Sequence, residues 1–242
     1  MSARYYSPVA AIYDPSDFPP FAVTADLVML TVRPPRFEVL LVKRASEPFA
    51  GAWALPGGFV APEQSLLAAA RTKLVDKTGV AVDETHLEQI ASFGQPERDP
   101  RMRVVSVAWL ALLADPPEPI AGTDTDEAAW VDVADIDRQS LAFDHATILD
   151  AGIERARNRI EYTTLAAQFC GNEFTIGELR SVYETLWDTE LDPANFHRKV
   201  LATDDFVTET GATSSGGRGR PARLYRRGSA TNLDPPLHRP SV

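Results

Sequence analysis

Apolar residues follow two different patterns along the chain, and the change between them divides the sequence into two parts. In the first part, apolar runs rich in β-branched residues are bounded by Pro, Gly and Asp, as is typical of buried strands. One amphipathic stretch, at about 65–78, interrupts these runs. Its residues Leu67, Ala70 and Leu74 have the spacing of a buried helical stripe, and the next glycine, Gly79, is placed to end the helix. This part is predicted to be an α/β or α+β domain, with strands over residues 22–32, 37–45, 103–113 and 127–133.

From Asp144 onward the pattern becomes helical. Asp144 itself is a residue type that often caps helices. Thr175 followed by Glu178 has the spacing of a capping box, and Asp192 before Pro193 marks the start of a further helix. Helices are therefore predicted near 145–158, near 161–170, over 175–187 and from 193 onward.

Positive charge is concentrated in one segment near the end of the chain. The 242 residues include 24 basic and 34 acidic ones, a formal net charge of -10, which argues against a general polyanion-binding protein unless the basic residues are segregated. Residues 206–227 have the pattern of a strand, a glycine-rich turn and a second strand. From Gly211 to Gly228 there is no acidic residue and there are five arginines: Arg218, Arg220, Arg223, Arg226 and Arg227.

Composition restricts the class of protein further. A hydrophobic content of 44% supplies a core, and the single cysteine, Cys170, excludes an intramolecular disulfide framework. No run of about 18 apolar residues is present, so neither a membrane partner nor a signal peptide is predicted and the expected location is the cytoplasm. Residues 1–20 are interpreted as an N-terminal arm. Residues 229–242, with three prolines and little apolar content, are predicted to be a disordered tail.

The predicted helix of the first part resembles the signature of the Nudix hydrolase family. That signature has a glycine, a glutamate six residues on, then Arg-Glu, two further glutamates and a glycine, and its carboxylates hold Mg²⁺ for splitting a diphosphate linked to another moiety. Gly58 and Gly79 match the terminal glycines, while Leu74 and Val80 match apolar positions. The flanking stretches LVKRASEPFAGAWALPGGF and FGQPERDPRMRVVSVAWLALL also resemble Nudix proteins that handle ADP-ribose. The resemblance implies a Nudix-like α/β/α sandwich over residues 21–155.

The residues expected to hold the metal differ from the family pattern. The glutamate positions are occupied instead by Gln64, Lys73, Asp76 and Lys77. Three glutamates on the helix face would carry -3, whereas Lys-Asp-Lys carries +1, and two ammonium groups repel a divalent cation. The sequence therefore predicts no metal, no cofactor and no hydrolysis by the family mechanism. Two interpretations remain open: an ordinary solvated helix face, or lysines that hold a diphosphate directly.

Three arginines are further candidates for contacts with a nucleotide. Arg44 ends a predicted strand, and Arg98 and Arg101 lie in a loop before another strand. Arginines at such places suit phosphate or ribose contacts, with plain surface solvation as the alternative. Trp53 and Phe93 are candidates for base stacking, with core packing as the alternative. The predicted ligand-binding set is Arg44, Lys73, Lys77, Arg98 and Arg101, and the neighbouring pair Asp144 and His145 is also within possible reach of a ligand.

The order of elements in the second part is typical of a winged helix-turn-helix. Two capped helices are followed by an arginine-bearing hairpin. On the second helix, Phe196 and Val200 are expected to face the core, so that Asn195 can pair with adenine and Arg198 with guanine. For the hairpin alone, a charged exposed turn is the alternative, but after this helix pair we predict DNA binding. The predicted DNA-binding residues are Thr175, Asn195, His197, Arg198, Lys199, Arg218, Arg220 and Arg223.

The second part also resembles a specific family. The stretches FTIGELRSVYETLW, LDPANFHRKV and GRPARLYRR, after a Nudix-like part containing LAFDHATIL, are similar to the Nudix-related transcriptional regulators called NrtR. The likeness covers about residues 20–228. It implies a winged helix over 156–228 that represses genes of NAD synthesis or salvage, and a Nudix domain that senses an NAD-related nucleotide such as ADP-ribose. The expected partners are an inverted-repeat operator in double-stranded DNA, a nucleotide effector and a second copy in a homodimer.

Two alternative functions remain open at this point. One is an active Nudix pyrophosphatase acting on ADP-ribose or a related nucleotide, with an accessory domain, which the missing glutamates oppose. The other is a constitutive DNA-binding protein with a vestigial pocket.

Overall fold

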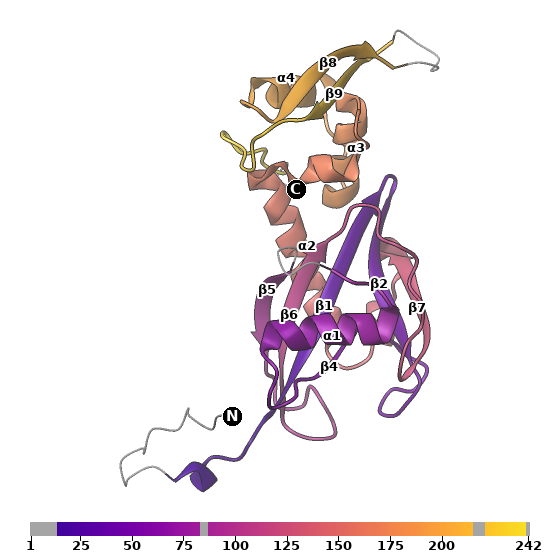
Figure 1. The fold of residues 1–242 in the computed structure, drawn as a ribbon, viewed down its shortest axis with the longest axis vertical. Coiled ribbons are helices and arrows are strands. Elements are labelled where there is room, and N and C mark those ends of the chain that lie inside the picture. The colour runs from indigo at the N-terminus through magenta and orange to yellow at the C-terminus, as the bar shows by residue number, and fades with distance from the viewer. Residues whose placement is uncertain (1–13, 83–86, 215–220, 241–242) are drawn as a thin grey trace.

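The structure of the protein is a computed structural model that describes residues 14–82, 87–214 and 221–240. A sheet with helices on its faces forms one end of the molecule, and a group of shorter helices with a hairpin forms the other (Figure 1). The long helix α2 (His145–Tyr162) runs from the first part into the second. Among the described helices, none is long and apolar enough to cross a membrane.

The described part of the first domain contains a seven-stranded mixed sheet. Its main order is β3-β2-β1-β6-β5, with β4 paired to β1 and β7 paired to β2. β1 and β6 are parallel, and the other pairs are antiparallel. The predicted strands correspond to β1, β2, β6 and β7, whereas the shorter β3, β4 and β5 were not predicted. The bounds are β1 (Ala22–Arg33), β2 (Arg36–Arg44), β3 (Trp53–Ala54), β4 (Gly57–Phe59), β5 (Glu88–Phe93), β6 (Val104–Leu112) and β7 (Thr125–Asp132).

The central strand β1 is buried on both faces, so its alternating side chains enter two different cores. Leu27 and Met29 pack in a core with α1 (Leu66–Thr78), whereas Val28 and Leu30 pack in a core with α2. The helices therefore cover opposite faces of the sheet. This confirms the predicted α/β/α sandwich.

Helix α1 ends at the predicted glycine, and a serine that the sequence analysis did not single out caps its start. Ser65 accepts a hydrogen bond from the Ala68 N–H at its start, and Gly79 adopts a left-handed conformation at its end, with φ of 68°. In the predicted apolar stripe, Ala70 and Leu74 are fully buried and Leu67 is partly buried.

Helix α2 begins at the predicted residue, His145, but extends beyond its predicted end. It continues without a break to Tyr162, so the predicted helices near 145–158 and 161–170 have the wrong bounds. The break lies at Thr163, which is extended, and a 3-10 helix (Thr164–Phe169) follows it. The predicted domain boundary between residues 155 and 156 falls inside this continuous helix. At the other end, Asp144 makes no side-chain capping hydrogen bond.

The second part has the predicted winged-helix elements, α3 (Ile176–Trp187), α4 (Pro193–Ala202), β8 (Val207–Thr213) and β9 (Arg223–Arg227). The capping box of α3 is formed, and the Asp192 carboxylate accepts a hydrogen bond from the backbone N–H at the third position of α4. The core of these helices is continuous with the core between α2 and the sheet. The two parts therefore share one hydrophobic core.

The prediction of a disordered tail is wrong for residues 229–240. Leu233 and Leu237 are buried in the shared core, with 5% and 3% of their surface exposed. Their backbone N–H groups donate to carbonyl oxygens at the end of α2. Two buried leucines and several backbone hydrogen bonds therefore order a segment whose composition had indicated disorder. Of the predicted N-terminal arm, residues 14–20 are described and lead away from the sheet (Figure 1).

Candidate functional site

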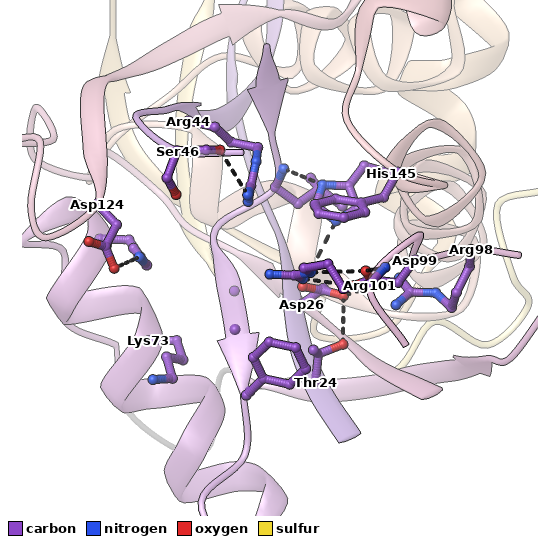
Figure 2. Close-up of a pocket in the computed structure, with 16 residues that line it drawn as sticks. Thr24, Asp26, Arg44, Ser46, Lys73, Arg98, Asp99, Arg101, Asp124 and His145 are labelled. Atoms are coloured by element: carbon purple, nitrogen blue, oxygen red, sulfur yellow. Dashed lines mark hydrogen bonds and ion pairs between the residues drawn. The ribbon is translucent and has the colours of Figure 1, made fainter. Parts of the chain in front are cut away.

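A polar pocket of about 240 Å³ lies between α1, β4, the loop before β6 and the start of α2 (Figure 2). The structure brings together in its walls all five residues that the sequence predicted for ligand binding: Arg44, Lys73, Lys77, Arg98 and Arg101. Their surroundings differ, and these differences decide what each side chain is free to do.

A buried carboxylate, Asp26 on β1, forms the inner end of the pocket. Its Oδ2 accepts a hydrogen bond of 2.5 Å from the Ser106 hydroxyl and a longer one of 3.3 Å from Thr24. Gly57 lies directly opposite on β4, where any Cβ atom would collide with this carboxylate. The sequence analysis did not identify Asp26, although it is the only acidic residue in a long apolar strand, a signal that was available.

Arg98 is buried and already paired with carboxylates, so its guanidinium is not free to bind a ligand. Its guanidinium donates to both carboxylate oxygens of Asp144, at 2.9 and 2.6 Å, and lies 3.6 Å from Asp26. Only 3% of its side chain is exposed. Asp144 occupies the N-cap position of α2 as predicted, but its carboxylate neutralises a buried arginine and makes no capping hydrogen bond.

His145 is a buried, neutral side chain beside Asp26. Its Nδ1 accepts a hydrogen bond of 2.9 Å from the Leu55 N–H, so the ring proton is on Nε2, which lies 4.0 Å from the Asp26 carboxylate. Burial lowers the pKa of His145, and the neighbouring Arg98 and Arg44 add to that effect against the opposing carboxylates. The imidazole thus presents an N–H donor toward the pocket floor.

Two arginines and two phenylalanines form a stacked wall. The guanidinium carbon of Arg101 lies 5.0 Å from the Phe59 ring and 5.4 Å from the Phe143 ring, and that of Arg44 lies 4.9 Å from Phe143. Asp99 binds Arg101 through both carboxylate oxygens. Burial acts to raise the pKa of Asp99, but the hydrogen bonds from Arg101 outweigh it and hold this pKa below the ordinary value. Such a wall suits a planar aromatic group.

The two lysines on α1 line the pocket but have different partners. Lys77 donates to the Thr123 carbonyl at 2.9 Å and lies 3.5 Å from the Asp124 carboxylate. The stem of Lys73 packs over the backbone of Gly58. In the part of the chain that the structure describes, no group forms a hydrogen bond or an ion pair with the Lys73 ammonium, and Figure 2 shows it on α1 with no interaction drawn to it.

Of the three substituted positions on α1, only two face the pocket. Lys73 and Lys77 point into the pocket, whereas Asp76 is exposed and is not part of its lining. The interpretation of the two lysines as an ordinary solvated face is therefore wrong for Lys77, of which 17% of the side chain is exposed. The position of Lys73 leaves the second interpretation, direct diphosphate binding, as a prediction.

The donor set does not fit the Mg²⁺ of the hydrolase signature. In the described ranges, no cluster of three His, Cys, Asp or Glu residues is arranged to hold a metal ion. Gln64 accepts a hydrogen bond from the Ala61 N–H, and ammonium groups stand where the signature has carboxylates. A divalent cation there would meet positive charge and too few hard oxygen ligands.

Several residues that line the pocket were missed, and two candidates lie elsewhere. Trp53 and Phe93 pack against the core and do not line the pocket. The other lining residues were missed because they come together only in the tertiary fold and have no characteristic spacing in the sequence. The missed lining residues include Thr24, Asp26, Ser46, Phe59, Asp99, Asp124 and Phe143.

The predicted DNA-binding residues are partly described. On α4, Phe196 and Val200 are buried as predicted, Asn195, His197 and Arg198 are exposed, and Lys199 is half-buried. The Arg198 guanidinium donates to the Asn195 side-chain oxygen at 2.6 Å.

The remaining residues of that set lie on α3 and the hairpin. Thr175 is occupied by its capping box, and Arg223 on β9 is exposed and forms an ion pair with Glu209 at 3.0 Å. Arg218 and Arg220 lie outside the described residues.

Comparison with known proteins gives consistent matches to both parts of the chain. The NrtR DNA-binding winged helix domain family matches residues 166–227, and the NUDIX domain family matches residues 22–152. The chain is 35% identical over 218 residues to the ADPR-responsive transcriptional repressor NtrR of Acinetobacter baylyi, covering 89% of this chain and 86% of the relative.

Two solved structures are also similar. Shewanella oneidensis NrtR complexed with a 27mer DNA has 30% identity and a TM-score of 0.67, covering 87% of this chain and 99% of that one. The NUDIX domain of the same protein complexed with ADP ribose has 35% identity and a TM-score of 0.52, covering 60% of this chain and 95% of that one.

Proposed function

The chain belongs to the NrtR family of Nudix-related transcriptional regulators, and from this premise we propose that it represses genes of NAD synthesis or salvage in response to a nucleotide such as ADP-ribose. The observation that carries the proposal is the unpaired ammonium of Lys73, at a polar pocket in the same chain as a winged helix. The Acinetobacter relative is ADPR-responsive, and the Shewanella NUDIX domain was solved with ADP ribose.

The chemistry of the pocket matches the parts of such a nucleotide. A diphosphate supplies the anionic oxygens that the Lys73 ammonium lacks. The wall of Phe59, Phe143 and Arg101 offers stacking to an adenine ring. Because Arg98 and Arg101 are already paired with carboxylates, Lys73 is the principal anchor for the diphosphate in this proposal.

The nucleotide is recognised and not hydrolysed in this proposal. Hydrolysis by the Nudix mechanism needs carboxylates that hold a metal and activate water. Lys73 and Lys77 stand on the pocket side of α1, and the remaining acid, Asp76, lies outside the pocket lining. The same arrangement allows a diphosphate to bind without a metal.

DNA is read by α4 in a symmetric dimer. The exposed Asn195 and Arg198 lie near the N-terminal half of this helix, the part that approaches base edges in helix-turn-helix proteins. A two-fold symmetric dimer requires an inverted repeat whose half-sites are separated by a whole number of turns, about 10 bp each.

Binding to a selected operator and to random DNA at two salt concentrations tests this proposal. Asn195→Ala and Arg198→Ala should each reduce the difference in binding free energy between the operator and random DNA by about 1–3 kcal/mol. Because Arg198 donates a hydrogen bond to Asn195, the loss of selectivity in the double variant should be smaller than the sum of the losses in the two single variants. Arg223→Ala should weaken binding to both DNAs and lower the salt slope by about one. Wild-type selectivity in both helix variants would contradict the assignment of α4.

A further inference from the structure

The segment of residues 229–240, here called the C-terminal strap, runs from the end of the hairpin back to α2 (Figure 1). At its start, the Ala230 N–H donates to the Asp205 carbonyl at 3.1 Å, and the Ala230 carbonyl accepts from the Thr164 hydroxyl at 2.7 Å. The strap is thereby attached to the base of the hairpin and to the 3-10 helix after α2.

The strap also supplies the cap of α2. A helix leaves its last four carbonyl oxygens without partners inside the helix. The Leu237 N–H donates to the Glu161 carbonyl and the Leu233 N–H to the Tyr162 carbonyl, each at 2.9 Å. Arg239 adds a two-oxygen ion pair with Glu154, two turns earlier on α2, at 3.2 and 2.7 Å.

On its other side the strap faces, across a small cavity, the helix that is proposed to read DNA, and Leu237 belongs to the same buried core as Phe196 of that helix. Leu237 and His238 line one wall of this cavity, and Asn195 and Lys199 of α4 line another. The strap is thus bonded to α2 on one side and faces α4 on the other. At the far end of α2, His145 lines the nucleotide pocket, and the preceding Asp144 pairs with Arg98 of the pocket wall.

We propose that the C-terminal strap fixes α4 in position relative to α2, and that simultaneous reading of two operator half-sites depends on it. This inference rests on the proposed function, because it presupposes that α4 binds DNA in a dimer. When one protomer of the dimer has bound its half-site, the α4 helix of the other protomer must already be positioned over the second half-site. A less firmly held α4 has a lower effective concentration at that second half-site. Binding to a single half-site does not carry this requirement.

The test compares the wild-type chain with a chain that ends at Ser229, using an operator selected from random DNA by the wild-type protein and the same DNA with one half-site scrambled. The shortened chain should bind the full operator at least about tenfold more weakly and the single half-site nearly as well as the wild type. Full-operator affinity within twofold of the wild type would overturn the proposal. An equal loss on both DNAs in a chain with native circular dichroism would also overturn it, since the strap would then only support the fold of the winged helix.

A charge exchange keeps the proposal testable if the shortened chain does not fold. Arg239→Glu and Glu154→Arg should each weaken binding to the full operator more than binding to the single half-site. The double variant, which has the wild-type net charge, should recover the wild-type affinity for the full operator. Absence of any difference between the Arg239→Glu chain and the double variant on the full operator would count against the strap. If the wild-type chain selects no operator at all, the proposed function fails, and that outcome differs from every failure of the strap.

Discussion

Lys73 shows how a single residue changes the chemistry expected of a helix. The Nudix signature has a glutamate at this position, and a lysine brings a positive charge to the same side of the pocket. The spacing of Lys73 and Lys77 in the sequence was enough to place both on one face of α1. It was not enough to distinguish them, because the partners of Lys77 come from a loop that is distant in the chain.

Replacing Lys73 by alanine should weaken ADP-ribose binding by about 10- to 150-fold, because one hydrogen bond from a charged group contributes about 1.5–3 kcal/mol. Isothermal titration in chelator measures this directly. Lys77→Ala should have a smaller effect, since Lys77 already has protein partners. Asp76→Ala on the same helix is the matched control and should not weaken binding, because this side chain is outside the pocket lining. Wild-type affinity in the Lys73→Ala chain would exclude the anchor role.

The protein should lose stability as the pH falls through the range in which His145 titrates. The pKa of the buried imidazole lies below its ordinary value of 6.5, so below that pH the unfolded chain binds a proton that the native chain excludes. The contribution of His145 to stability is therefore fully present above about pH 6.5 and is lost toward lower pH. His145→Asn keeps an acceptor for the Leu55 N–H but does not titrate, so its melting temperature should fall less between about pH 7.5 and about pH 5.5. If the melting temperatures of the wild-type and His145→Asn chains fell equally with pH, His145 would not be the source of the pH dependence.

Helix α2 and the strap illustrate which elements the sequence predicted and which it did not. Capping signals located α1, α3 and α4 because a cap depends on residues close in sequence. The full length of α2 was missed because its second half is stabilised by packing on α3 and by the strap, which lies about seventy residues further along the chain. The strap was read as disordered because its two core leucines are few among prolines and polar residues.

Gly152, in the middle of α2, should be intolerant of alanine. A Cβ atom there would lie 2.6 Å from a methyl carbon of Val28 on β1, whose branched side chain has little freedom to move. The clash should cost about 1–3 kcal/mol of unfolding free energy, which outweighs the helix propensity of alanine, about 1 kcal/mol. Gly177→Ala in α3, where the nearest atom is 3.6 Å away, is the control and should be neutral or stabilising in urea denaturation. Equal stability of the two variants would disprove the close contact between α2 and the sheet.

On the scale of the whole molecule, the pocket and the winged helix are joined by one helix and one core. α2 begins beside the Arg98–Asp144 ion pair and ends beneath the strap and α3. The core that packs α2 on the sheet continues into the winged helix. A change that a bound nucleotide causes at the start of α2 would therefore reach the winged helix through one continuous helix and one core. Family membership was evident from the sequence motifs, whereas this connection depends on tertiary packing.

The most direct test of the central claim is a titration of operator binding with ADP-ribose, run once in chelator and once with Mg²⁺, with the nucleotide recovered at the end of both titrations. The account predicts that operator affinity changes to a plateau as ADP-ribose increases, that ADP-ribose is recovered intact, and that Lys73→Ala shifts the response to higher nucleotide concentration. It would be contradicted by operator affinity that does not respond to ADP-ribose, together with Mg²⁺-dependent release of AMP and ribose phosphate by the same protein.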